Sequence, residues 1–69
     1  MTLFVIRRRS KRSQLRAAPG RGRYEGVYTK VMEDIWFFRT YQAAQEMCLP
    51  DEHVESMSLY IHVPETPAT

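Results

Sequence analysis

The 69-residue chain has one cysteine, Cys48, and two histidines, His53 and His62. A single cysteine excludes an internal disulfide, and a reducing compartment is the simplest setting for such a chain. The apolar run Leu3–Ile6 is too short for the core of a signal peptide or for a membrane span. We therefore expect a protein without membrane segments that works in the cytoplasm.

Acidic residues are absent from the first 24 positions, and the balance reverses in the rest of the chain. The first 24 positions carry eight basic residues: Arg7, Arg8, Arg9, Lys11, Arg12, Arg16, Arg21 and Arg23. After them, only Lys30 and Arg39 oppose eight acidic residues. Such asymmetry is typical of proteins that contact nucleic acid, a membrane or a charged macromolecule. We predict that the eight basic residues bind phosphate groups or an acidic protein surface, because guanidinium groups bind phosphate and carboxylate in pairs of hydrogen bonds.

The sequence has little that could support catalysis. A metal site would need Cys48, His53 and His62 with Asp51, but this spacing matches no zinc pattern. A Cys48–His53 nucleophile pair is weak, because Cys48 falls near the end of a short predicted helix where the helix dipole disfavours a thiolate. The stretch 20–22 (GRG) lacks the length and the Lys-Ser/Thr of a phosphate loop. We predict a protein that is not an enzyme and needs no metal or cofactor.

Hydrophobic patterns predict the elements of a single domain over residues 1–69. Leu3–Ile6 is predicted to be a strand that continues into Arg7 and Arg8, and both of its faces are apolar, as in a central or covered strand. Residues 8–22 are predicted to form a basic flexible loop, because proline, glycine, serine and like charges disfavour regular structure.

Further strands are predicted over 23–28, 35–39 and 54–63, with a turn or one helical turn over 29–34. Thr40 is predicted to cap a helix over 41–49 that Pro50 ends. The helix would bury one stripe, formed by Ala43, Ala44, Met47 and Cys48. Residues 64–69 are predicted to be a disordered tail. The fold class is therefore α+β: an antiparallel sheet of three or four strands with one helix packed on one face.

The aromatic residues allow two interpretations. Trp36, Phe37 and Phe38 could form a platform on which bases stack, or they could belong to the core. In a strand, Trp36 and Phe38 share one face and Phe37 lies on the other, so at least one set should be buried. The same two interpretations apply to Tyr24, Tyr28, Tyr41 and Tyr60.

The segment 23–45 resembles a pattern found in very small phage and prophage proteins. The residues that carry it are Tyr24, Phe38, Arg39, Thr40 and Ala43. Together with the short length and the arginine-rich start, the chain is similar to small lytic-phage proteins that bind the host's bacterial RNA polymerase. This resemblance implies docking on the N-terminal region of the beta-prime subunit, displacement of the sigma factor and antitermination, with NusA as a possible companion, in the host bacterial cytoplasm.

Two other functions stay open on the sequence alone. The chain could be a small basic module that binds nucleic acid, or another phage counter-defence protein of the anti-CRISPR type. The basic N-terminal part excludes an acidic DNA mimic, although the acidic later part leaves a weaker form of that function open. For the polymerase hypothesis we expect a monomer that contacts nucleic acid weakly and without sequence preference.

Overall fold

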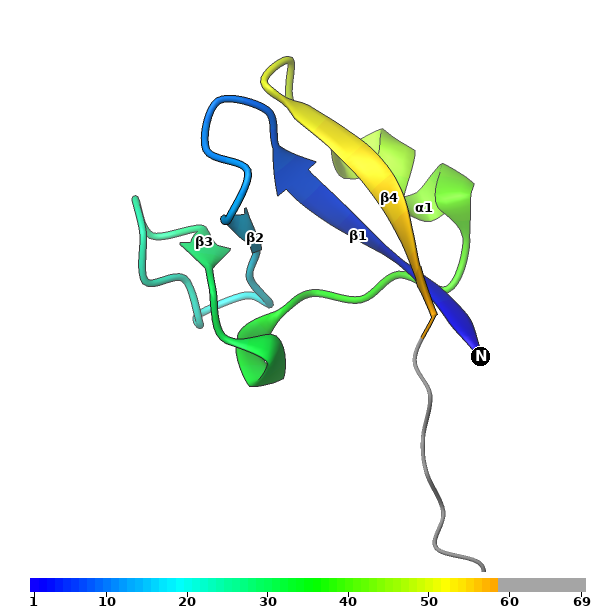
Figure 1. The fold of residues 1–69 in the computed structure, drawn as a ribbon, viewed down its shortest axis with the longest axis horizontal. Coiled ribbons are helices and arrows are strands. Elements are labelled where there is room, and N and C mark those ends of the chain that lie inside the picture. The colour runs from blue at the N-terminus through cyan, green and yellow to red at the C-terminus, as the bar shows by residue number, and fades with distance from the viewer. Residues whose placement is uncertain (59–69) are drawn as a thin grey trace, which may run out of the picture.

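The computed structural model describes residues 1–58. Its elements are β1 (Thr2–Arg8), β2 (Leu15–Arg16), β3 (Tyr28–Thr29), the 3-10 helix η1 (Met32–Asp34), α1 (Tyr41–Met47) and β4 (Glu52–Ser58). The four strands form one antiparallel sheet in the order β3-β2-β1-β4, and α1 lies behind β4 in Figure 1. This architecture confirms the predicted α+β class with one helix on one face of the sheet. Within residues 1–58, no helix combines the length and the apolar character needed to cross a membrane.

β1 is the central strand, as its two apolar faces predict. It pairs with β4 along its whole length, from Thr2 opposite Ser58 to Arg8 opposite Glu52. Its other edge is shared: Arg7 lies opposite Leu15 of β2, while Phe4 exchanges two backbone hydrogen bonds of 2.8 Å with Phe38. Side chains of successive residues in a strand point to opposite faces, so β1 supplies one buried residue to each of two hydrophobic clusters.

The two clusters lie on opposite faces of the sheet. Ile6, Phe38 and Ala44 form the cluster under α1, and Trp36 packs against it. Val5, Leu15 and Ile35 form the other, and Phe37 packs against that one. The predicted separation of Trp36 and Phe38 from Phe37 is therefore confirmed.

α1 begins as the sequence predicts and ends earlier. The Thr40 hydroxyl accepts a hydrogen bond of 3.1 Å from the Ala43 N–H, which satisfies one of the free donors of the first turn. The helix ends at Met47, two residues before the predicted end. Ala44 is fully buried, but Met47 is exposed, so the predicted stripe is wrong at Met47. The reason is that Met47 is the last helical residue, at the edge of the contact with the sheet.

The predicted loop over 8–22 is wrong at its centre. Leu15 and Arg16 form β2, and Leu15 and Ala17 are buried. Ala17 donates a backbone hydrogen bond to Val27 and Ala18 donates one to Asp34. The burial of two apolar side chains and these hydrogen bonds offset the conformational entropy that the segment loses on ordering. The charge density alone had predicted that this loss would keep the segment flexible. The segment is thus a hairpin arm of the sheet, followed by a second loop over 19–23.

The strand predicted over 23–28 is mostly a tight turn. Glu25 and Gly26 have φ angles of 54° and 76°, and Val27 donates to the Tyr24 carbonyl. Two consecutive central residues with positive φ are characteristic of a type I′ turn. Only Tyr28 continues into a strand, β3.

The prediction of a strand over 35–39 is also wrong, because this segment forms isolated bridges and no regular strand. Ile35 bridges to Ala17 and Phe38 bridges to Phe4, so this segment crosses from β2 to β1 and forms no continuous ladder with either. By contrast, η1 confirms the predicted helical turn within 29–34. β4 confirms the strand predicted over 54–63 for residues 54–58, although it begins two residues earlier, at Glu52. The rest of that strand, and the tail over 64–69, lie outside the described residues.

Candidate interaction surface

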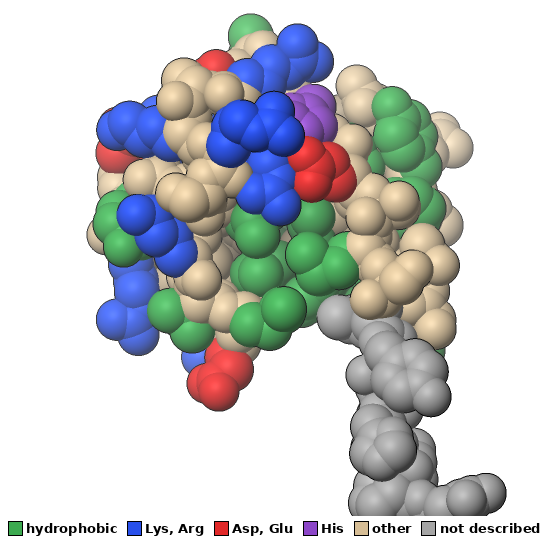
Figure 2. Space-filling view, in the orientation of Figure 1, with side chains coloured by type: hydrophobic (Ala, Val, Ile, Leu, Met, Phe, Trp, Pro, Cys, Tyr) green, Lys and Arg blue, Asp and Glu red, His purple; other side chains and the backbone are tan. Residues whose placement is uncertain are grey.

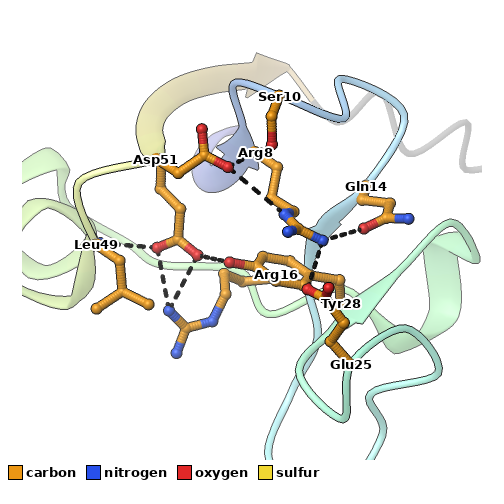
Figure 3. A network of polar contacts seen from close by, with 9 residues as sticks. Arg8, Ser10, Gln14, Arg16, Glu25, Tyr28, Leu49 and Asp51 are labelled. Carbon is orange, nitrogen blue, oxygen red and sulfur yellow. Dashed lines mark hydrogen bonds and ion pairs between the residues drawn. The ribbon is translucent and has the colours of Figure 1, made fainter.

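The eight basic residues from Arg7 to Arg23 lie in a segment that we call the basic arm. Five of them pair with carboxylates of the same chain and three do not, within the residues that the structure describes. Arg8 belongs to the first group, and its side chain is only 13% exposed. It lies 2.7 Å from Glu25, donates to the Gln14 side chain at 2.8 Å and stacks over the Tyr28 ring at 4.4 Å (Figure 3). Arg8 is therefore held against β3 by the turn that contains Glu25.

Arg16 pairs with a carboxylate from the later, acidic part of the chain. Its guanidinium lies 3.2 Å from Glu52, the first residue of β4, whose side chain is fully buried. Glu52 also accepts hydrogen bonds from the Tyr28 hydroxyl and from the Leu49 N–H. Burial, followed by the hydrogen bond to Glu52, raises the pKa of Tyr28 to about 12. The phenol thus stays protonated and donates to the carboxylate throughout the physiological range.

Arg7 pairs across the sheet. Its Nε lies 2.8 Å from Glu55 on β4, and the ring of His53 contacts the same carboxylate. Burial acts to raise the pKa of Glu55, but the hydrogen bonds from Arg7 and His53 outweigh it and leave the pKa below its usual value. Arg7 also donates to the backbone carbonyl of Arg12 and so ties the hairpin tip to β1.

Arg21 and Arg23 share one carboxylate. Asp34 of η1 accepts from Arg21 at 3.3 Å and from Arg23 at 3.2 Å. The bond from Arg23, more than that from Arg21, lowers the pKa of Asp34. The aspartate side chain is 9% exposed, whereas the two arginine side chains are 64% and 65% exposed.

The second group is the basic tip, which we define as Arg9, Lys11 and Arg12. These residues connect β1 to β2 and are all exposed, and within residues 1–58 none of them forms an ion pair with a carboxylate. The Arg9 N–H donates to the Asp51 carbonyl at 2.7 Å, and the Gln14 N–H donates to the Lys11 carbonyl. The backbone of the tip is thus fixed at both ends while its charged side chains face solvent.

Figure 2 shows how this charge is distributed on one face of the molecule. Lys and Arg side chains follow the top and the side that carries β2 and β3, around a central apolar area. Leu3, Phe37 and Met57, each partly exposed, come from the face of the sheet opposite α1, and Phe37 and Met57 pack on the cluster of Val5.

The remaining candidate residues contribute to packing and pairing. Cys48, the residue that follows the last turn of α1, is half-buried and packs against the cluster of Ile6. Burial raises the pKa of its thiol, and the negative charge of Glu52 raises it further. His53 is engaged by Glu55, and His62 lies outside the described residues. Residues 1–58 contain no group of three or more Cys, His, Asp or Glu side chains arranged to hold a metal ion.

The aromatic residues are divided between core and surface. Phe38 is buried and Trp36 stacks on it with ring centroids 4.7 Å apart, while Arg16 lies over the Trp36 ring. Tyr28 is buried in the ion network. Tyr24 and Tyr41 are exposed, and Tyr41 meets the edge of Phe4. Tyr60 lies outside the described residues.

The acidic partners were missed by the sequence reasoning, which treated the two charge blocks as separate. Glu25, Asp34, Glu52 and Glu55 come from the acidic part and bind five of the eight basic residues. The one available signal was the pairing of strands, since an acidic strand beside a basic one favours cross-strand ion pairs. Comparison of the chain with family models, curated proteins and solved structures finds no match.

Proposed function

We propose that this protein acts by binding, and that its basic tip docks on an acidic surface of a larger macromolecule. The observation that carries the proposal is the division of the basic residues. Five pair with carboxylates of the same chain, whereas Arg9, Lys11 and Arg12 project from a braced hairpin without an acidic partner among residues 1–58. A braced, exposed cluster of like charges favours fast, steered association with a surface of opposite sign.

For the partner we propose bacterial RNA polymerase, on the basis of the sequence resemblance. The tip would meet the N-terminal region of the beta-prime subunit, and the consequences would be displacement of sigma, inhibition of initiation and antitermination, with NusA as a companion. The support from this chain is its small size and its exposed basic tip.

The test compares two double variants that remove the same charge. Arg9→Gln/Lys11→Gln removes two charges from the tip, and Lys30→Gln/Arg39→Gln removes two exposed charges elsewhere. Binding to purified core polymerase and holoenzyme is measured at low and at physiological ionic strength, together with run-off transcription from a sigma-dependent promoter. We expect the tip variant to associate about tenfold more slowly at low ionic strength, because exposed charges act chiefly on the association rate.

The control variant should associate at nearly the unmodified rate. If the unmodified protein forms no complex with polymerase and leaves transcription unchanged, the polymerase proposal is wrong. If both double variants slow association equally, net charge and not the tip is responsible.

A nucleic-acid-binding module is the second candidate, and the same tip favours it. Side chains that meet several phosphates give an affinity that falls steeply with salt. Titration of labelled single-stranded and double-stranded oligonucleotides over a range of salt concentrations separates the two candidates. Tight binding that resists salt and depends on the base sequence would favour the second candidate over the first.

A further inference from the structure

The loop over 19–23, drawn in cyan between β2 and β3 in Figure 1, surrounds an open hollow on the surface. The hollow has a volume of about 490 Å³ and is lined by Pro19, Gly20, Arg21, Gly22, Arg23 and Asp34. This size falls within the range of roughly 300–1,000 Å³ that is common for small-molecule sites. Only proline among the lining residues is apolar, so recognition here would depend on charge and hydrogen bonds.

The backbone of the loop is fixed in its present shape. Arg21 donates to the Ala18 carbonyl at 2.9 Å, and Gly20 has φ +82°, as a type II turn with proline before glycine requires. Gly22 packs against the backbone of the neighbouring turn, where a Cβ atom would lie 2.2 Å from the Gly26 carbonyl carbon. The two arginines are thus carried by a short segment with little conformational freedom.

The charges in the hollow do not balance. Asp34 is the one carboxylate among the lining residues, and two guanidinium groups converge on it. Arg21 uses its Nη1 for this contact and Arg23 uses its Nε, although each guanidinium has five N–H donors. Both side chains are more than 60% exposed, so most of these donors are accessible to a ligand.

We propose that this hollow binds a phosphate group. Asp34 holds one N–H group of each arginine, and the remaining N–H groups of the two exposed side chains are the donors that would bind the phosphate oxygens. Planar forks of this kind match the oxygens of phosphate, and an anchored pair loses less side-chain entropy on binding than two free arginines would. Gly20 has open space where a Cβ atom would lie, so a ligand can approach the backbone closely there. This site is separate from the basic tip.

The test is an NMR titration of the full chain with inorganic phosphate, with adenosine monophosphate and with adenosine, at constant ionic strength set with sodium chloride. We expect saturable shifts of the Gly20 and Gly22 amides and of the Arg21 and Arg23 Nε–H signals with both phosphate compounds, and none with adenosine. Equal affinity for the two compounds would identify free phosphate as the ligand, and tighter binding of the monophosphate would identify a nucleotide.

Variants decide whether the two arginines form the site. Arg21→Gln and Arg23→Gln should each weaken binding about tenfold or more, and Arg23→Lys should lie between them and the unmodified chain because it keeps the charge but loses the fork. Arg39→Gln, an exposed basic residue outside the loop, is the control and should bind normally. Arg9→Gln/Lys11→Gln should also bind normally, which separates this site from the proposed docking function.

Two results would overturn the proposal. One is the absence of saturable shifts with both phosphate compounds, and the other is a set of shifts distributed equally over the tip and the loop. The dispersion of each variant's spectrum reports its fold, and if one glutamine variant is unfolded the other, together with Arg23→Lys, still gives the comparison.

Discussion

Glu52 is the most buried charged residue in the part of the chain that the structure describes, and donors from three segments converge on it. Arg16 of β2, the Tyr28 hydroxyl of β3 and the Leu49 N–H after α1 all bind its carboxylate (Figure 3). Burying a charge is costly unless it is paired and hydrogen-bonded, and here both conditions hold. One side chain therefore connects the start of β4 to the two short strands at the far edge of the sheet.

Replacing Glu52 by alanine should destabilise the fold severely. The change leaves the Tyr28 hydroxyl without its acceptor in a buried place and leaves the largely buried Arg16 without its carboxylate partner. Removal of one partner of a buried ion pair costs about 3–5 kcal/mol. A domain of this size has a total stability of about the same amount. We therefore expect Glu52→Ala to be largely unfolded at 25 °C, as measured by circular dichroism and urea denaturation.

Glu46→Gln is the matched control, because Glu46 is exposed on α1. Its effect should stay within about 0.5 kcal/mol, as for most surface substitutions. If Glu52→Ala unfolds with nearly the same urea midpoint as the unmodified chain, the network does not support the fold.

At the scale of elements, β2 is a strand of two residues inside the most charged part of the chain. Its neighbours Ala17 and Ala18 donate backbone hydrogen bonds to Val27 and Asp34, and the Arg16 carbonyl accepts from Trp36. The basic arm is therefore joined to three later segments at its centre, whereas the N–H groups of Lys11 and Arg12 form no such backbone bond within residues 1–58.

Hydrogen exchange should divide the arm in the same way. We expect the amides of Ala17 and Ala18 to exchange at least about tenfold more slowly than those of Lys11 and Arg12, because bonded amides exchange only when the structure opens. The measurement is a series of NMR spectra after transfer into heavy water, with the β1 amides as the protected reference. Uniformly fast exchange from Arg9 to Gly22 would instead support the flexible loop that the sequence alone predicts.

The elements predicted correctly are those whose signals are local. β1 follows from a compact β-branched and aromatic run, and the Thr40 cap follows from the hydroxyl beside an alanine-rich segment. The segment 35–39 has the same composition as a strand, but its bonds are divided between Ala17 and Phe4. Which partners are within reach depends on the whole topology, so composition could not distinguish this crossing segment from a strand.

The sequence predicted which basic residues could form the candidate interaction surface, but it did not predict which of them pair with carboxylates of the same chain. The eight basic residues were visible as a block, but the choice of Arg8 and Arg16 for burial depends on the turn at Glu25 and on the register of β4. Glu25 reaches Arg8 because it and Gly26 both have positive φ, which composition alone did not indicate. Arg21 and Arg23 were among the residues predicted to bind phosphate, but their convergence on Asp34 was missed because Asp34 lies in the acidic part of the sequence, eleven residues after Arg23.

For the whole molecule, the two charge blocks of the sequence are not two charged halves. Acidic residues from the turn after residue 24, from η1 and from β4 fold back on the basic arm and pair with it. The exposed members of this set each contribute little, commonly about 0–1 kcal/mol, whereas the pair of Arg16 with Glu52 is buried. Five of the eight basic residues that the sequence predicts to bind a partner therefore pair with carboxylates of the same chain.

This pairing predicts that acid weakens the fold in a defined range of pH. The pKa values of Asp34 and Glu55 lie below those of the unfolded chain, so the unfolded chain binds more protons as the pH falls. Their contribution is complete above the unfolded values, about 3.9 for aspartate and 4.3 for glutamate, and is lost as the pH falls through the lower folded values. We therefore expect the urea midpoint to be steady from pH 7 to about pH 5 and to decline below it. Arg21→Gln/Arg23→Gln should make that decline shallower because Asp34 then loses the hydrogen bonds that lower its pKa while burial still acts to raise it. Lys30→Gln/Arg39→Gln, which removes the same charge from residues that do not bind Asp34, should leave the steepness unchanged. Equal steepness in the two double variants would show that the pairs with Asp34 do not couple protonation to folding.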